Sequence, residues 1–197
     1  MILLDPDLDA DPSPRSTSVK RTTAAKTATK PTQFRLPSAR ALTRFLSEAQ
    51  AAVRLRGEVT VLLTTDAEIR RLNRRFRGKN KATDVLSFPA EADFGGPEKI
   101  AGDLAISVDT ARRQGTACGH SLSMELKVLM LHGLLHLAGY DHEADNGKME
   151  RREQVLRARL GLPLGLIERS QARRKNKDAP NLGHPRTKIT ANSGGRP

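Results

Sequence analysis

The sequence predicts a single-domain α/β protein whose small sheet is mixed but mostly parallel and is packed by helices. Segments with helical periodicity alternate with short strand-like segments, a pattern typical of sheets with crossover helices. The longest apolar segment, residues 122–137, is interrupted by polar side chains and is shorter than the about 20 residues of a membrane span, so we expect a buried central helix. The length of 197 residues suits one domain with additional polar segments.

Composition divides the chain into four segments. Residues 1–10 contain a possible first strand, and residues 34–168 form the predicted folded body. Residues 11–33 and 169–197 are basic and poor in large apolar side chains, which predicts a disordered insert and a disordered tail. These two segments carry net charges of +4 and +7 out of a total of +12, so most of the basicity favours polyanions without naming one.

The first elements follow from caps and periodicity. Ile2 to Leu4 is expected to form the first strand. Ser38 is expected to cap a helix that Gly57 ends. The apolar positions of this helix have helical spacing: Leu42, Phe45, Leu46, Ala49 and Val53. Alternating valine and leucine side chains then predict a strand over 59–63.

The middle of the body contains one more helix and two more strands. Residues 65–68, Thr-Asp-Ala-Glu, have the pattern of a capping box and are expected to open a helix over 66–76. Its apolar positions are expected to face inward: Ile69, Leu72 and Phe76. Short β-rich runs predict strands over 85–88 and 104–108.

Three helices are predicted for the remainder of the body. Asp109 is expected to cap a helix over 110–117, and Ser121 or Ser123 is expected to cap the long apolar helix. A last helix is expected from about residue 147 to residue 160.

The cysteine content and the first residues bear on the compartment. A single cysteine, Cys118, excludes an intrachain disulfide and fits a reducing environment. The first ten residues lack the basic start and long apolar stretch of a secretory signal. We therefore expect a cytoplasmic protein outside the membrane, whose oligomeric state the sequence does not define.

Three of the five histidines fall within residues 131–142, Leu-His-Gly-Leu-Leu-His-Leu-Ala-Gly-Tyr-Asp-His. His132 and His136 are four residues apart on the predicted helix, so both imidazoles leave the same face about 6 Å apart. His142 can join them only if the chain turns, and Gly139 stands where a left-handed residue allows that turn. We expect the three histidines to bind one Zn²⁺ at the end of the central helix, with a fourth position left for water as in catalytic zinc sites.

Other interpretations of this segment stay open. His132 and His136 alone would also suit satisfied core residues of an apolar helix, and the third histidine favours a metal. Asp141 is a candidate partner for an imidazole N–H. Glu125 shares a helical face with His132, and we expect a surface or salt-bridge role for it. The spacing also matches the H-E-x-x-H-x-x-G-x-x-H pattern of metzincin proteases, but Gly133 replaces the glutamate that acts as general base.

A basic stretch precedes the third strand, with seven Lys and Arg between Arg70 and Lys81. The arginines on the predicted helix suit a solvated face as well as a phosphate contact. Residues 77–81, Arg-Gly-Lys-Asn-Lys, are expected past the helix in a loop, where Arg77 can bind a phosphate through its planar guanidinium. Aromatic side chains are too few for a stacking platform, so any RNA recognition should depend on phosphate and shape.

These motifs resemble a known family. The histidine segment 131–142 resembles the signature of the YbeY endoribonucleases, which are bacterial rRNA maturation factors. Residues 72–89, Leu-Asn-Arg-Arg-Phe-Arg-Gly-Lys-Asn-Lys-Ala-Thr-Asp-Val-Leu-Ser-Phe-Pro, resemble the family's other marker, and residues 102–106, Gly-Asp-Leu-Ala-Ile, are a weaker third. The resemblance identifies residues 34–168 as a YbeY-like metal-dependent hydrolase domain, with the insert and the tail outside the usual pattern.

The resemblance implies a zinc-dependent, single-strand-specific endoribonuclease that acts in 16S rRNA 3′-end maturation and in ribosome quality control. Its implied partners are the 16S rRNA precursor and the small ribosomal subunit. It implies His132, His136 and His142 as zinc ligands and Arg77 as a catalytic residue that holds a phosphate. Two other functions compete with it: a non-catalytic ribosome-assembly factor with a structural zinc, and a metzincin-like protease.

Overall fold

The computed structural model describes residues 1–8, 36–90 and 100–163. The predicted disordered insert and tail, residues 11–33 and 169–197, therefore lie outside the described residues. Within the described ranges, none of the helices combines the length and the apolar character that a bilayer crossing requires.

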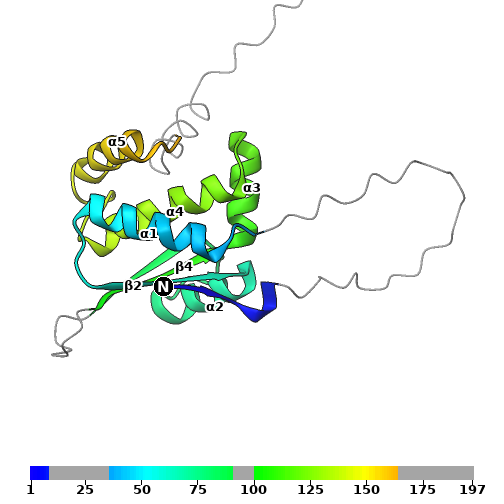
Figure 1. Ribbon diagram of the computed structural model, residues 1–197. Coiled ribbons are helices and arrows are strands. Elements are labelled where there is room, and N and C mark those ends of the chain that lie inside the picture. The colour runs from blue at the N-terminus through cyan, green and yellow to red at the C-terminus, as the bar shows by residue number, and fades with distance from the viewer. Residues whose placement is uncertain (9–35, 91–99, 164–197) are drawn as a thin grey trace, which may run out of the picture.

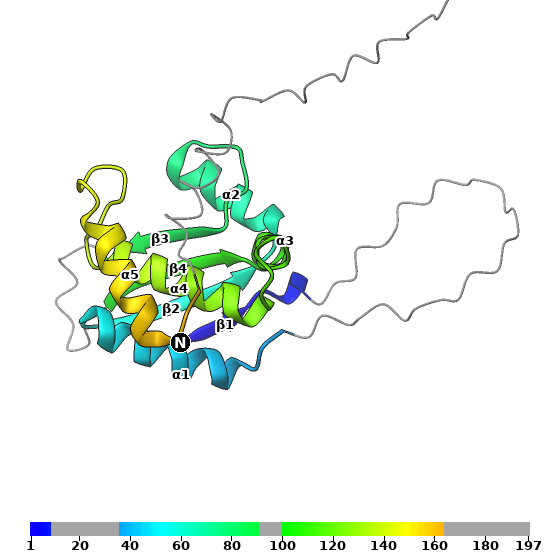
Figure 2. The same cartoon turned by 90° about the horizontal axis from the view of Figure 1, so that it is seen from above.

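A four-stranded sheet forms the middle of the fold (Figures 1 and 2). Its strands lie in the order β1 (Ile2–Leu4), β2 (Glu58–Thr64), β4 (Ile100–Ser107) and β3 (Val85–Pro89). The first three are parallel to one another, and β3 pairs antiparallel with β4. The predicted mixed, mostly parallel sheet is confirmed. β1 leads into a short 3-10 turn, η1 (Pro6–Leu8).

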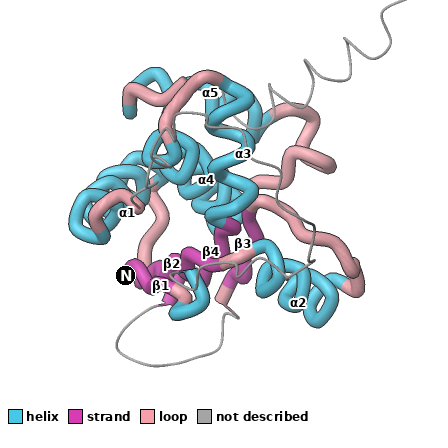
Figure 3. The backbone as a smooth tube through the Cα atoms, turned by 90° about the vertical axis from the view of Figure 1, so that its right-hand side faces the viewer, coloured by secondary structure: helices cyan, strands magenta, loops and turns pink. Residues whose placement is uncertain are grey.

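Helices cover both faces of this sheet (Figures 1 and 3). On one side lie α1 (Ala39–Val53) and α4 (Leu122–Leu137), with α5 (Lys148–Leu160) packed on them farther from the strands. α2 (Asp66–Arg77) lies on the opposite side, and α3 (Val108–Cys118) packs against α4. Each predicted helix and strand is therefore present, and the differences lie at their ends.

The apolar segment forms α4, the central helix of the core. It lies between the sheet on one side and α1, α3 and α5 on the others, so it is apolar around most of its circumference. Seven of its apolar side chains are completely buried: Leu126, Val128, Leu129, Met130, Leu131, Leu134 and Leu135. The expected buried central helix is confirmed.

Two of the predicted helix ends are wrong. α1 begins at the expected cap, with Ser38 Oγ accepting a hydrogen bond from the Ala41 amide, but it ends at Val53 rather than near Gly57. Arg54 takes the left-handed conformation there, with a φ of 67°, and its amide donates to the helix carbonyls. A non-glycine residue in the left-handed conformation is uncommon, so the sequence favours the next glycine, Gly57, as the end of the helix.

The second wrong cap lies at the start of α3. Ser107, the last residue of β4, is the N-cap and accepts a hydrogen bond from the Thr110 amide at 3.0 Å. Asp109, the predicted cap, lies inside the first turn and accepts a hydrogen bond from the Asp66 amide instead. The strand passes directly into the helix without a loop, so the cap lies two residues earlier than predicted.

The buried centre of α4 supports a stability prediction. Leu129→Ala should destabilise the protein by about 2–5 kcal/mol, because it removes a completely buried side chain and leaves a cavity between packed layers. Denaturant unfolding of Leu129→Ala and of the control Leu4→Ala measures this loss. Leu4 is 51% exposed, so its replacement should change the free energy of unfolding by no more than about 0.5 kcal/mol. Equal losses for the two variants would contradict the assigned core.

Candidate metal centre

The end of α4 carries two of the three candidate ligands. His132 and His136 lie one helical turn apart, and the chain leaves the helix immediately after them. Gly139 adopts a φ of 86°, which favours glycine, and the amide of Tyr140 donates to the Leu135 carbonyl as the backbone turns. This turn returns His142 to the pair, so the predicted role of Gly139 is confirmed.

The three imidazoles meet at one place. The Nε2 atoms of His132 and His136 are 3.2 Å apart, and one ligand nitrogen from each of the three histidines lies within 4.8 Å of the others. Two nitrogens bound tetrahedrally to one zinc ion are about 3.3 Å apart, given Zn–N bonds of about 2.0–2.1 Å. The His132–His136 separation therefore fits a shared ion without rearrangement of α4.

Burial is graded across the cluster. His132 is buried, His136 is partly buried and His142 is exposed. Among the residues that the structure describes, no additional His, Cys, Asp or Glu joins this group of three. The arrangement is therefore enclosed by protein on one side and accessible on the other.

The electrostatics keep the central imidazole neutral. The pKa of His136 is lowered from 6.5 to about 4, first by burial and then by the neighbouring His132 and His142, against an opposing hydrogen bond to the Tyr140 carbonyl. A neutral imidazole keeps a lone pair on one ring nitrogen, which is the form that binds a metal.

The Nδ1 atoms of His132 and His136 point away from the cluster. His136 Nδ1 lies 3.0 Å from the Tyr140 carbonyl oxygen, and His132 Nδ1 lies 3.5 Å from Glu153 Oε1 on α5. Asp141, the predicted partner, accepts a hydrogen bond from the Glu143 amide through Oδ1, and its role beside an imidazole stays a prediction. Both observed partners leave Nε2 as the nitrogen that faces the metal position.

Glu153 was missed by the sequence interpretation, although a signal for it exists. On α5, Met149 and Leu156 are buried, and Glu153 lies between them at helical spacing with only 2% exposure. A carboxylate within an apolar stripe needs a partner. The sequence alone does not say which residue that partner is.

Gly133, between the two α4 histidines, lies against the sheet. A Cβ atom at this position would come within 2.7 Å of Leu104 Cδ2 on β4, and the Gly133 carbonyl accepts a hydrogen bond from Ser87 Oγ at 3.4 Å. The position that holds glutamate in metzincins therefore faces β4 without space for a side chain. The close packing agrees with the argument against a protease.

The basic stretch differs from its prediction at two residues. Arg77 is the last residue of α2 rather than the first of a loop. Phe76 is 57% exposed rather than inward; its ring contacts Phe88 edge-on, and the Arg75 guanidinium lies 5.3 Å from its centre. The buried residues of α2 are Ile69, as predicted, and Asn73, whose side-chain amide donates to the Lys81 carbonyl and so ties the basic loop to the helix.

The helix that ends at Arg77 and the helix that carries His132 and His136 lie on opposite faces of the sheet. α4 and α2 cover different sides of it (Figures 1 and 3), yet both contact the edge strand β3. Ser87 contacts Gly133 of α4, and the adjacent Phe88 contacts Phe76 of α2. The basic end of α2 and the histidine end of α4 thus border the same strand.

Glu125 does not reach the histidine cluster. It is completely buried, and its Oε2 lies 3.5 Å from His120 Nδ1 at the junction of α3 and α4. The expected salt-bridge role therefore holds, although the carboxylate is buried rather than on the surface.

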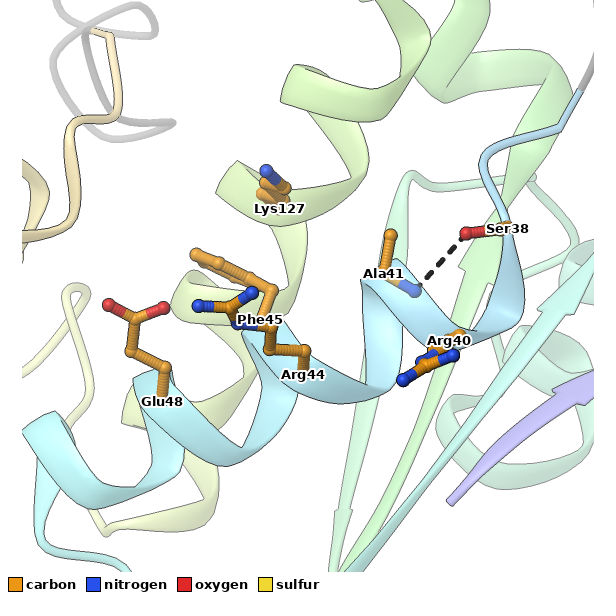
Figure 4. A pocket seen from close by; sticks show the side chains of 7 residues that line it. All are labelled: Ser38, Arg40, Ala41, Arg44, Phe45, Glu48 and Lys127. Carbon is orange, nitrogen blue, oxygen red and sulfur yellow. Dashed lines mark hydrogen bonds between the residues drawn. The ribbon is translucent and has the colours of Figure 1, made fainter.

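A separate hollow lies where α1 passes α4 (Figure 4). Its volume is about 470 Å³. It is lined by Ser38, Arg40, Ala41, Arg44, Phe45, Glu48 and Lys127. None of the three histidines lines it, so its cationic side chains do not contribute to the candidate metal centre.

The fold and the cluster define a small α/β protein with an accessible three-histidine centre at the end of a buried helix. A family model described as Endoribonuclease YbeY matches residues 21–161. This chain belongs to the YbeY family.

Individual relatives agree with the family match. Proteins named Endoribonuclease YbeY from Koribacter versatilis and Solibacter usitatus are 54% and 52% identical to this chain. These alignments cover 68% and 67% of this chain and 84% and 86% of the relatives. A third, from Nautilia profundicola, is 50% identical over 58% of this chain and 80% of its own length.

The lowered pKa of His136 predicts a pH dependence of the metal-free protein. The unfolded chain takes up a proton near pH 6.5 and the folded chain only near pH 4, so stability is full above about pH 6.5 and falls as the pH drops towards 4. His136→Asn should lose less stability over this interval than the wild type. Urea unfolding of both proteins at pH 7.5 and 4.5 measures the difference, and an NMR titration that places the His136 pKa near 6.5 would refute it.

Proposed function

We propose that this chain is a zinc-dependent endoribonuclease whose metal is held by His132, His136 and His142. The observation that carries the proposal is the 3.2 Å separation of the two Nε2 atoms on α4, in a chain of the YbeY family. Relatives that are 50–54% identical carry the name Endoribonuclease YbeY, which supports RNA as the substrate.

The three histidines suit catalytic rather than structural zinc. Structural zinc sites usually have four protein ligands, whereas catalytic sites have three and leave a position for water or substrate. A zinc ion bound in this way supplies Lewis acidity and lowers the pKa of a bound water molecule towards neutrality. The exposed side of the cluster gives a phosphodiester a route of approach.

Arg77 has the role of holding the phosphate. An arginine guanidinium offers a planar set of charged donors to phosphate oxygens. An RNA strand lying along edge strand β3 would pass between the end of α2 and the end of α4. In that placement Arg77 neutralises the phosphate charge that increases during cleavage. The scissile phosphodiester bond would lie at the three histidines, on the other side of β3.

The finer function follows the family resemblance. We propose that the substrate is single-stranded RNA at the 3′ end of the 16S rRNA precursor, that the enzyme also serves ribosome quality control, and that it works in the cytoplasm on the small ribosomal subunit. The basic side chains on α2 favour contacts to the RNA backbone, so binding should weaken strongly with salt.

Metal content and cleavage test this proposal together. His132→Ala and His136→Ala should each lose most of the bound zinc and most cleavage of a 16S 3′-end precursor, because two remaining imidazoles cannot hold the ion tightly. Elemental analysis and a gel-based cleavage assay measure the two properties. His120→Ala is the matched control, since this histidine pairs with Glu125 outside the cluster.

Two outcomes would contradict the proposal. Unchanged cleavage by a zinc-free His132→Ala protein would eliminate the metal mechanism. Stoichiometric zinc in a wild-type protein that associates with small subunits but cleaves no RNA would favour a non-catalytic assembly factor with structural zinc.

The role of Arg77 is tested separately. Arg77→Ala should lower kcat/KM for RNA at least about 10-fold while leaving bound zinc unchanged, because it removes a charged hydrogen-bond donor to phosphate and no metal ligand. Arg70→Ala, a change of the same kind at an exposed arginine on the same helix, should have a much smaller effect. Equal losses of kcat/KM for the two variants would contradict a specific role of Arg77 in holding the phosphate.

A further inference from the structure

Glu153 contributes a buried carboxylate beside the candidate metal centre. It lies on α5, is 2% exposed, and its Oε1 lies 3.5 Å from His132 Nδ1. His132 is itself 3% exposed. Two polar side chains are therefore enclosed together in a region that is otherwise formed by aliphatic residues of the core.

Neither of the two facing atoms has another partner. Glu153 Oε1 and His132 Nδ1 are buried and accept or donate no other hydrogen bond within the described residues. A buried carboxylate oxygen without a donor is costly, as is a buried ring nitrogen without a partner. At 3.5 Å the pair is at the long limit of a hydrogen bond, and a small movement of either side chain would satisfy both groups.

The orientation of the ring explains why this contact matters. His132 Nε2 faces His136 Nε2, so the opposite nitrogen, Nδ1, is the one that faces Glu153. A proton on Nδ1 that is donated to the carboxylate leaves the Nε2 lone pair free for the metal. His136 has the equivalent arrangement, with the Tyr140 carbonyl oxygen 3.0 Å from its Nδ1.

We propose that Glu153 is a positioning residue that holds His132 through Nδ1 and so directs Nε2 at the metal. The inference rests on the proposed zinc centre. It assigns to α5 a part in metal binding, although this helix contributes no ligand. Partners of this kind typically change metal affinity by about 10- to 100-fold in other metalloproteins.

The test measures zinc affinity by competition with a chromophoric chelator, using the full chain and no RNA. Glu153→Leu should weaken zinc binding roughly 10- to 100-fold, because it removes the acceptor. Glu153→Gln should lose less, since its amide oxygen still accepts the Nδ1 proton. Glu150→Gln is the matched control on the same helix, and it should bind zinc as the wild type does.

A second measurement reports the ring itself. Nitrogen-15 NMR of the metal-free protein should show the His132 proton on Nδ1 in the wild type and in Glu153→Gln. Glu153→Leu should show a mixture of the two tautomers. If Glu153→Leu does not fold, the ring nitrogen that carries the His132 proton in the wild type decides the proposal.

The outcomes separate this inference from the proposed function. Zinc affinities of both Glu153 variants within three-fold of the wild type, or a His132 proton on Nε2, would overturn the role of Glu153 alone. A wild-type protein that binds no zinc would overturn the metal centre and this inference with it. Zinc binding that depends on Glu153 without RNA cleavage would support the positioning role and count only against the nuclease.

Discussion

The placement of two imidazoles at the end of a helix that is otherwise surrounded by apolar side chains governs the rest of this structure. Burial, together with the neighbouring imidazoles, lowers the pKa of His136 to about 4, so the ring is neutral at physiological pH and can offer a lone pair. Burial also makes an unpartnered ring nitrogen costly, most of all at His132, whose Nδ1 is buried. The Tyr140 carbonyl and the Glu153 carboxylate lie opposite the Nδ1 atoms of His136 and His132, and they come from the following turn and from α5.

The sheet determines where this helix can lie. A Cβ atom at Gly133 would lie 2.7 Å from Leu104 Cδ2 of β4. The glycine therefore lets α4 approach the strands closely at the level of the histidines. The edge strand β3 contacts α4 through Ser87 and α2 through Phe88. The histidine cluster and the basic end of α2 therefore border the same edge strand, and the path proposed for an RNA strand rests on this arrangement.

Local rules explain which predictions succeeded. Helix caps and hydrophobic periodicity depend on residues within one or two helical turns, so the sequence alone predicts them. Examples are the caps Ser38 and Ser121 and the apolar segment 122–137. Exposed Phe76 is different, because its inward prediction assumed that periodicity alone decides burial. Asn73 is buried on α2, and its side-chain amide donates to the carbonyl of Lys81. Lys81 lies in the loop after the helix, and only folding brings this carbonyl next to Asn73.

The sequence by itself determined the element order, the buried central helix and the turn at Gly139, because backbone preferences and hydrophobic periodicity are local properties. It also determined that His132 and His136 share one helical face. Only the tertiary structure decided the surroundings of the site: Glu153 lies beside the His132 imidazole, and α2, which ends at Arg77, lies on the face of the sheet opposite α4 (Figure 1). These relations join residues on different elements, and their distances are set by how the layers pack, which no local pattern encodes.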